Sequence, residues 1–455
     1  MKTTALIPFA LAALLSGCIA ATSAAQEVWS VDRCMAYAVA HNRTVRQRTY
    51  EADNYRQAHT KAIGSFLPAV NGSIGAQYNY GRSVDPETNT YNNISTFNNG
   101  YALETSIPLF QGGYLIHQVR QARANVLLGK AALQEARDNT ALETFQAYIN
   151  ALYCYGTARL ARQKLADSDS LLYKTRRLEE LGLKGAADVA QVAAQQAADA
   201  YNLTHQENLY ATALLTLRQQ MNLPAVDHLL LDTCLIADLP VEAEGPQPAD
   251  TEDIYYTALA LNPGLRQAKL RKQAAKMERK MSLSAFFPRI SFYAGLSTSY
   301  YKELHKTGYP SWKKQLDTNF GQYFGFSLSL PVFNRLSSLT ARRQAVNNYR
   351  IAEEQYEAKK EELQKLVQQA VQDREGYRKE SLQMARKVES DALAYRITRR
   401  KYEEGLMTSL DVKTNAATLL ESQTLLLQSR LTYLMKCRLV DYYQGEELIR
   451  EEETN

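Results

Sequence analysis

Apolar and polar residues alternate along four short stretches of the chain, and a period of two predicts β-strands. The first stretch, 70–80, ends in tyrosine and is 11 residues long. That length and ending are typical of a tilted strand that crosses a bilayer and meets an interfacial aromatic girdle. The others are 101–109, 290–297 and 324–330. In the third, one face carries Ile290, Phe292, Ala294 and Leu296, predicted to point outward, and the other carries Ser291, Tyr293, Gly295 and Ser297, predicted to point inward.

Long segments of helical composition separate these strands. All 12 prolines lie outside 109–223 and 332–455, which indicates helix because proline disrupts a helix interior. The helices are expected over 31–65, 114–181, 186–222, 334–404 and 406–444. At a rise of ~1.5 Å per residue, the helix over 114–181 would be roughly 100 Å long.

One twelve-residue pattern occurs twice, each time between two long helices. LEELGLKGAADV at 178–189 aligns without a gap with KYEEGLMTSLDV at 401–412, at an offset of 405 − 182 = 223. A glycine can end one helix and an aspartate can cap the next. Each copy therefore predicts the tip of an antiparallel helical hairpin. The aspartates can be ordinary helix caps, binding residues, or both.

The duplication extends over most of the chain. Phe66 and Phe286, like Gly75 and Gly295, are separated by 220 positions. We divide the chain into a first repeat over 26–223, a linker over 224–250 that holds a proline cluster, a second repeat over 251–445, and a tail over 446–455. Residues 82–98 and 302–319 are predicted to be exposed loops.

The N-terminus predicts export. Lys2 and the apolar run after it, followed by small residues before Gln26, fit a signal peptide over 1–25. The alternative is a lipoprotein signal that ends before Cys18, which would then be lipidated. The remaining cysteines match no metal-site spacing, and we interpret them as small buried residues: Cys34, Cys154, Cys234 and Cys437.

Composition and charge exclude several classes of function. A net charge of +5 without a basic run argues against nucleic acid as a partner. The six histidines show no paired spacing, so neither an enzyme nor a metal site is expected. Tyrosine is unusually frequent, with 29 residues, which suits interfacial strands.

The architecture requires more than one copy of the chain. Two strands per repeat give four per chain, and an open sheet in lipid leaves backbone groups unpaired. Bacterial barrels begin at eight strands. Two chains would supply eight strands, in a barrel whose bore side chains fill. Three chains would supply twelve strands, and the polar inward faces favour this wider, water-filled barrel. The long alanine- and glutamine-rich helices suit the wall of a tube.

The chain resembles the outer membrane efflux protein (TolC) family over 28–448. The motifs that carry this resemblance are FLP at 66–68 and FFP at 286–288, PLFQGG and PVFNR after the second and fourth strands, and the paired tips. The resemblance implies a mainly helical trimer with a shared twelve-stranded outer-membrane β-barrel and a periplasmic α-barrel. It also implies a passive exit duct for efflux or type I secretion that docks to a periplasmic adaptor and an inner-membrane transporter. The alternative is a soluble periplasmic coiled-coil scaffold or adaptor.

The resemblance further implies roles for individual tip residues. Gly182, Leu183 and Asp188, with Gly405, Leu406 and Asp411, match the adaptor-docking tips. Asp188, Tyr402 and Asp411 match gate positions, the last as part of an acidic ring. Three other gate positions differ from the family pattern, so we expect a weaker or different closure: Met407, Ala187 and Thr414.

Overall fold

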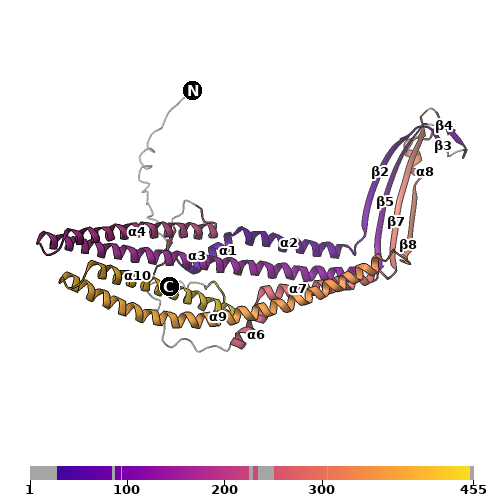
Figure 1. Ribbon diagram of the computed structural model, residues 1–455. Coiled ribbons are helices and arrows are strands. Elements are labelled where there is room, and N and C mark those ends of the chain that lie inside the picture. Colours follow the sequence, from indigo (N-terminus) through magenta and orange to yellow (C-terminus); the bar gives the residue numbers. More distant parts are fainter. Residues whose placement is uncertain are drawn as a thin grey trace, which may run out of the picture.

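The computed structural model describes residues 28–84, 88–93, 95–224, 229–233, 251–304 and 306–450. The molecule is elongated, with a four-stranded sheet at one end and long helices that run away from it (Figure 1). The predicted signal peptide with Cys18, Cys234 and most of the 224–250 linker lie outside the described residues.

The predicted strands and long helices are confirmed, with small shifts at their ends. The sheet consists of β2 (Ala69–Asn79), β5 (Thr96–Gln111), β7 (Arg289–Glu303) and β8 (Gly321–Ser329). The helices of the first repeat are α1 (Val31–His41), α2 (Arg43–Gly64), α3 (Tyr114–Glu180) and α4 (Ala186–Met221). Those of the second are α6 (Thr251–Leu261), α7 (Pro263–Ser284), α9 (Ser337–Glu403) and α10 (Ser409–Tyr443).

The stretch 31–65 is two helices rather than one. Asn42 is extended, with φ −64° and ψ 133°, and its side chain accepts a hydrogen bond of 2.7 Å from the Thr44 amide. It therefore ends α1 and caps α2. Asn262, its counterpart 220 positions later, likewise accepts from the Leu265 amide at 2.9 Å between α6 and α7. The duplication thus preserves a helix break that the composition did not reveal.

The start of the second long helix is also later than predicted. Arg335 and Leu336 have φ of 56° and 64°, a left-handed conformation that helical residues do not adopt. The helix α9 therefore begins at Ser337 instead of at 334.

The sheet is antiparallel throughout, in the order β2-β5-β7-β8, so the two repeats meet at the β5–β7 pair. The predicted alternation holds in register: Ile74 pairs with Tyr101, and Leu103 with Leu296. One face carries exposed apolar side chains. They include Val70, Ile74, Tyr78, Leu103, Leu296, Phe324, Phe326 and Leu328. The opposite face is rich in serine, asparagine and glycine.

Two glycines on the polar face make room for tyrosine rings. Gly295 pairs with Tyr323 and Gly325 pairs with Tyr293. A Cβ at Gly295 would lie 2.5 Å from the Tyr323 ring, and one at Gly325 would lie 2.7 Å from the Tyr293 ring. These positions need glycine because the rings cross the strands.

Both predicted loops contain ordered elements. Within 82–98, β3 (Arg82–Val84) pairs with β4 (Tyr91–Asn93), and β5 has already begun at Thr96. Within 302–319, Trp312–Thr318 forms the short helix α8. β3 and β4 pair with each other, and α8 is held by hydrogen bonds to β7. The periodicity of the sequence does not indicate such contacts.

The main core lies halfway along the helices, where α1, α3, α4 and α10 meet. The buried Tyr148 hydroxyl lies between the carbonyl oxygens of Trp29 and Asp232, at 3.1 and 3.2 Å, and shares its one proton between them. This contact connects the core to the small parallel pair β1 (Val28–Trp29) and β6 (Leu230–Leu231). Cys34 is buried in this core, as predicted, and burial raises the pKa of its thiol to about 12. Cys154 and Cys437 are only half-buried, so the prediction of burial is wrong for them. No described helix has the length and apolarity needed to cross a membrane.

Candidate functional site: the helical tips

The tip between α3 and α4 is closed by a glycine in the left-handed conformation. Gly182 has φ 75°, its amide donates to the Glu179 carbonyl at 2.8 Å, and the Leu183 amide donates to the Leu178 carbonyl at 2.9 Å. This pair of bonds is the Schellman motif, which satisfies the last carbonyls of a helix. The chain then turns directly into α4.

The tip between α9 and α10 repeats this geometry. Gly405 has φ 80°, its amide donates to the Tyr402 carbonyl at 3.0 Å, and the Leu406 amide donates to the Lys401 carbonyl at 2.8 Å. A Cβ at either tip glycine would meet no atom within 4 Å. Both glycines are therefore required by backbone conformation and not by crowding.

The tips lie at the end of the molecule opposite the sheet (Figure 1), and they present exposed apolar side chains. Leu183 is 68% exposed and Leu406 is 72% exposed. Two further leucines beside them are also exposed, Leu181 and Leu410. Four exposed leucines at one end form a surface suited to contact with another protein.

Both predicted tip aspartates act as helix caps. The Asp188 carboxylate accepts from the Gly185 amide at 3.3 Å, at the start of α4. The Asp411 carboxylate accepts from the Thr408 amide at 2.9 Å and from its hydroxyl at 2.7 Å, and Thr408 in turn caps the Asp411 amide. The Thr408 hydroxyl and then its amide hold the pKa of Asp411 below its usual range. Asp411 is exposed, so its other carboxylate oxygen can face a ligand or an ion.

Tyr402 is buried behind the second tip, with 1% of its surface exposed. Its hydroxyl lies 3.3 Å from the Thr175 hydroxyl on α3, and the Lys184 amine lies 4.3 Å from the centre of its ring. Burial raises the pKa of Tyr402, the Thr175 hydrogen bond opposes this, and the Asp188 carboxylate adds to the increase. The ring therefore connects the first hairpin to the second and is close to Asp188 without being hydrogen-bonded to it.

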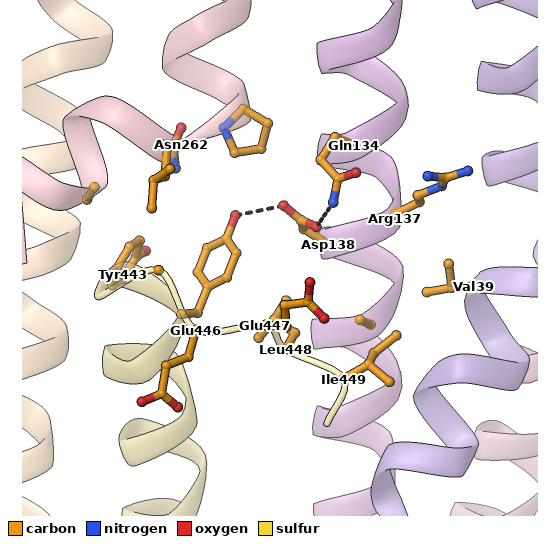
Figure 2. A pocket seen from close by; sticks show the side chains of 16 residues that line it. Val39, Gln134, Arg137, Asp138, Asn262, Tyr443, Glu446, Glu447, Leu448 and Ile449 are labelled. Carbon is orange, nitrogen blue, oxygen red and sulfur yellow. Dashed lines mark hydrogen bonds between the residues drawn. The ribbon is translucent and has the colours of Figure 1, made fainter. Parts of the chain in front are cut away.

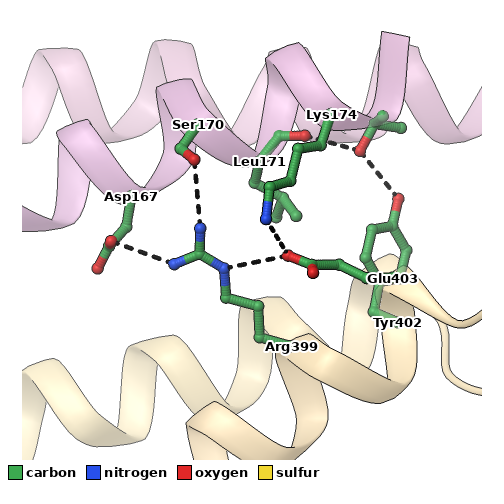
Figure 3. A network of polar contacts seen from close by, with 8 residues as sticks. Asp167, Ser170, Leu171, Lys174, Arg399, Tyr402 and Glu403 are labelled. Atoms are coloured by element: carbon green, nitrogen blue, oxygen red, sulfur yellow. Dashed lines mark hydrogen bonds and ion pairs between the residues drawn. The ribbon is translucent and has the colours of Figure 1, made fainter. Parts of the chain in front are cut away.

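A polar network joins the two hairpins next to Tyr402 (Figure 3). The Lys174 amine lies 2.7 Å from a Glu403 oxygen, and the Arg399 guanidinium lies 3.2 Å from Asp167 and 3.3 Å from the Ser170 hydroxyl. These bonds connect α3 to α9. Nearer the tip, the Ser409 hydroxyl donates to Gln191 at 2.8 Å and connects α10 to α4.

No local pattern in the sequence predicts this network. Lys174, Arg399 and Glu403 lie on helices dense in charged residues, where nothing in the spacing separates partners from solvated side chains. The three departures from the family pattern make no such connection: Thr414 donates to the Leu410 carbonyl of its own helix, Ala187 is exposed, and Met407 is half-buried.

A cavity of about 380 Å³ lies far from the tips, between α3, α10 and the segment after α10 (Figure 2). Tyr442 donates to the Asp138 carboxylate at 2.9 Å, and Gln134 donates to its other oxygen at 2.8 Å. Burial raises the pKa of Asp138, against the effect of these two hydrogen bonds. The pair joins the two repeats across the middle of the molecule.

Known proteins share both sequence and architecture with this chain. Residues 36–223 and 254–436 match the family described as outer membrane efflux protein. The toluene efflux pump outer membrane protein TtgF of Pseudomonas putida is 25% identical over 407 residues, covering 88% of this chain and 80% of the relative. The antibiotic efflux pump outer membrane protein ArpC of Pseudomonas putida is 25% identical over 410 residues, or 87% of this chain and 78% of the relative.

Solved structures show the same fold at lower identity. The outer membrane protein VceC of Vibrio cholerae superposes with a TM-score of 0.74 at 16% identity, covering 91% of this chain and 96% of VceC. The CmeC outer membrane channel of Campylobacter jejuni gives a TM-score of 0.74 at 15% identity, covering 92% of this chain and 87% of CmeC.

Proposed function

The chain belongs to the outer membrane efflux protein family, and from this we propose that it is the exit duct of a tripartite efflux or type I secretion system, docked through its tips. As an efflux channel of the outer membrane, it has its sheet in lipid and its helical body in the periplasm. It is a conduit and carries out no reaction. A soluble scaffold does not fit the exposed apolar face of the sheet.

We propose that three copies form one channel. Within the described residues, β2 and β8 each have a single partner strand, so each leaves one edge unpaired. An open edge in lipid is costly, and closure with two further chains would pair every strand in a twelve-stranded barrel. The six hairpins of such a trimer would line a periplasmic tube.

The observation that carries the docking proposal is the matched geometry of the two tips. Each tip ends in a Schellman glycine and presents an exposed leucine just after it, Leu183 or Leu406. Six copies around a trimer would form a ring of near-equivalent sites. A periplasmic adaptor whose own helical hairpins end in apolar residues would fit this ring, and an inner-membrane transporter would supply the cargo.

We further propose that Asp411 contributes an acidic ring at the periplasmic entrance and that Tyr402 and Asp188 belong to the gate. The support is the exposed, hydrogen-bonded carboxylate of Asp411 and the burial of Tyr402 between the hairpins. The network of Lys174, Arg399 and Glu403 would replace the latch that Met407, Ala187 and Thr414 do not provide.

Co-purification with the adaptor tests the docking proposal. The double variant Leu183→Asp/Leu406→Asp should lose adaptor binding, because charged side chains would enter an apolar contact. It should still form trimers and conduct ions in planar bilayers. The matched control is Leu215→Asp, at an exposed leucine of α4 outside the tip. Equal adaptor recovery with the double variant and the control would remove the tips from the docking site.

A further inference from the structure

The short helix α8 packs on the apolar face of the sheet rather than on the polar one. Thr298 shares the face of its register partner Tyr101 and of Leu296, two residues away on the same strand. The Thr298 hydroxyl donates to the Leu316 carbonyl of α8 at 2.6 Å. The Trp312 ring meets the Tyr101 ring edge-on, with 6.2 Å between their centres.

α8 also covers backbone groups that the sheet leaves open. The pairing of β7 with β8 stops at Ser297 and Gly321. Beyond that point, the Gln315 side chain accepts from the Tyr301 amide and donates to the Tyr301 carbonyl, both at 3.0 Å. The position of α8 is thus fixed by hydrogen bonds and does not depend on an apolar contact alone.

The helix lies at the outer edge of the apolar band. From Ile290 to Thr298 the strand advances eight residues, which is about 27 Å at ~3.4 Å per residue. At the usual tilt of about 40° this is roughly 20 Å of height, close to the ~25 Å apolar band of outer-membrane strands. Because β7 starts beside the periplasmic helices, α8 sits at the level of the outer headgroups.

The side chains of α8 divide in the way that an interfacial helix requires. Trp312, Gln315 and Leu316 lie on the side that faces the sheet. At 100° per residue, Lys313 lies beside this side and Lys314 opposite it. Trp312 is 50% exposed and Phe320 is 55% exposed, so aromatic surface remains for lipid although the helix is docked.

Three exposed lysines gather on this side of the sheet: Lys302, Lys313 and Lys314. Lys302 pairs with Phe97 and so points from the apolar face. Over the described residues, none of the three is in an ion pair. Among the described acids of 302–319, Glu303 accepts from the Tyr309 hydroxyl at 3.3 Å, and Asp317 lies at the exposed end of α8.

We propose that α8 and Lys302 form a lipid-binding surface for the phosphate groups of an anionic glycolipid in the outer leaflet. The aromatic side chains would lie at the acyl boundary, and the ammonium groups would reach the phosphates above it, as snorkelling lysines do. This inference rests on the sheet lying in the membrane and is independent of the docking at the tips.

Tryptophan fluorescence tests where α8 lies. The chain has 2 tryptophans, Trp29 and Trp312, so Trp29→Phe leaves Trp312 as the single reporter. In vesicles of brominated lipids, bromine near the headgroup should quench it more than bromine deep in the acyl chains. Strong quenching by aqueous iodide without quenching by brominated lipid would place α8 away from lipid and overturn the proposal.

Binding of diphosphoryl lipid A to the detergent-solubilised full-length protein tests the lysines. A lysine near an anionic surface strengthens binding roughly fivefold, so K302Q/K313Q/K314Q should weaken binding on the order of 100-fold. The control variant K61Q/K130Q/K365Q removes three exposed lysines of the helices and the same charge, and it should bind like wild type. Native gel migration and bilayer conductance verify that both variants assemble.

Two outcomes of the binding experiment would contradict the proposal. Equal weakening in both triple variants would mean that net charge alone attracts the lipid. Displacement of lipid A by millimolar inorganic phosphate would indicate a site for a free ion. Weaker binding of monophosphoryl than of diphosphoryl lipid A, confined to proteins with the three lysines, would support it.

Discussion

The Lys174 amine on α3 lies 2.7 Å from the Glu403 carboxylate on α9, so an ion pair connects the first hairpin to the second just behind the tips. Arg399 approaches the same carboxylate at 3.7 Å and continues to Asp167. The Glu403 oxygen is thus shared by two cations. Arg399 and Glu403 are both on α9, so movement of the hairpins apart must break the Lys174–Glu403 and Arg399–Asp167 pairs together.

We expect Arg399→Ala to raise the open fraction of the channel. The substitution removes the contacts across to Asp167 and Ser170 on α3, each worth up to about 1 kcal/mol at a partly exposed site. The open fraction should rise several-fold, measured as single-channel open time in planar bilayers. Arg396→Ala is the matched control, because Arg396 is an exposed arginine of the same helix one turn earlier. An open time unchanged from wild type would mean that the network does not hold the tips.

We expect the second tip to tolerate asparagine but not alanine in place of Gly405. The backbone there has φ 80°, which costs alanine about 1 kcal/mol or more and asparagine less. Gly405→Ala should therefore make the tip more sensitive to limited proteolysis, and Gly405→Asn should largely preserve it.

Gly376 provides the opposite control for this prediction. It lies inside α9, and an added Cβ there would meet no atom within 4 Å. Gly376→Ala should stabilise the helix by roughly 0.5–1 kcal/mol. If Gly405→Ala and Gly376→Ala shift the thermal midpoint in the same direction, the argument from backbone conformation is wrong.

We expect Asp411→Asn to reduce the cation selectivity of the channel, measured from reversal potentials in a salt gradient. In the wild type, the Thr408 hydrogen bonds lower the pKa of Asp411, so its charge should persist as the pH falls to about 4, the usual carboxylate value. Because the folded pKa is the lower one, the cap stabilises the tip above the unfolded pKa and weakens as the pH falls through the folded pKa. Asp53→Asn, at an exposed carboxylate of α2, is the control. Unchanged selectivity would remove Asp411 from the entrance.

Much of the fold could be predicted because each element repeats a strong local signal. Proline-free helices and alternating strands depend on periodicity, and the tip glycines depend on backbone conformation, all of which a sequence carries directly. The duplication allows a comparison of the two repeats, because Gly182 and Gly405 are both predicted to end a helix at a tip. Both have the positive φ that this role requires.

The parts that could not be predicted depend on contacts between distant segments. The ordered α8 needs the hydrogen bonds of Thr298 and Tyr301 on β7. The break at Asn42 is an exception, because its cap to the Thr44 amide is local. The network at Glu403 joins residues 229 positions apart on surfaces rich in charge. Local pattern carries no information on which of those charges meet.

We expect Asp138→Asn to stabilise the protein at neutral pH. Burial raises the pKa of Asp138, so its contribution to stability is complete only below the unfolded pKa and is lost as the pH rises through the folded pKa. Asparagine has no charge to bury, and its amide can donate to the Tyr442 hydroxyl while its oxygen accepts from Gln134. The gain should be on the order of 1 kcal/mol, the usual size of the effect of one substitution, measured by urea unfolding of the detergent-solubilised protein at pH 7. It should disappear below about pH 4, where aspartate is neutral in both states. Asp138→Ala loses both hydrogen bonds and should destabilise at either pH, so a loss of stability with asparagine would show that the charge itself holds the two repeats together.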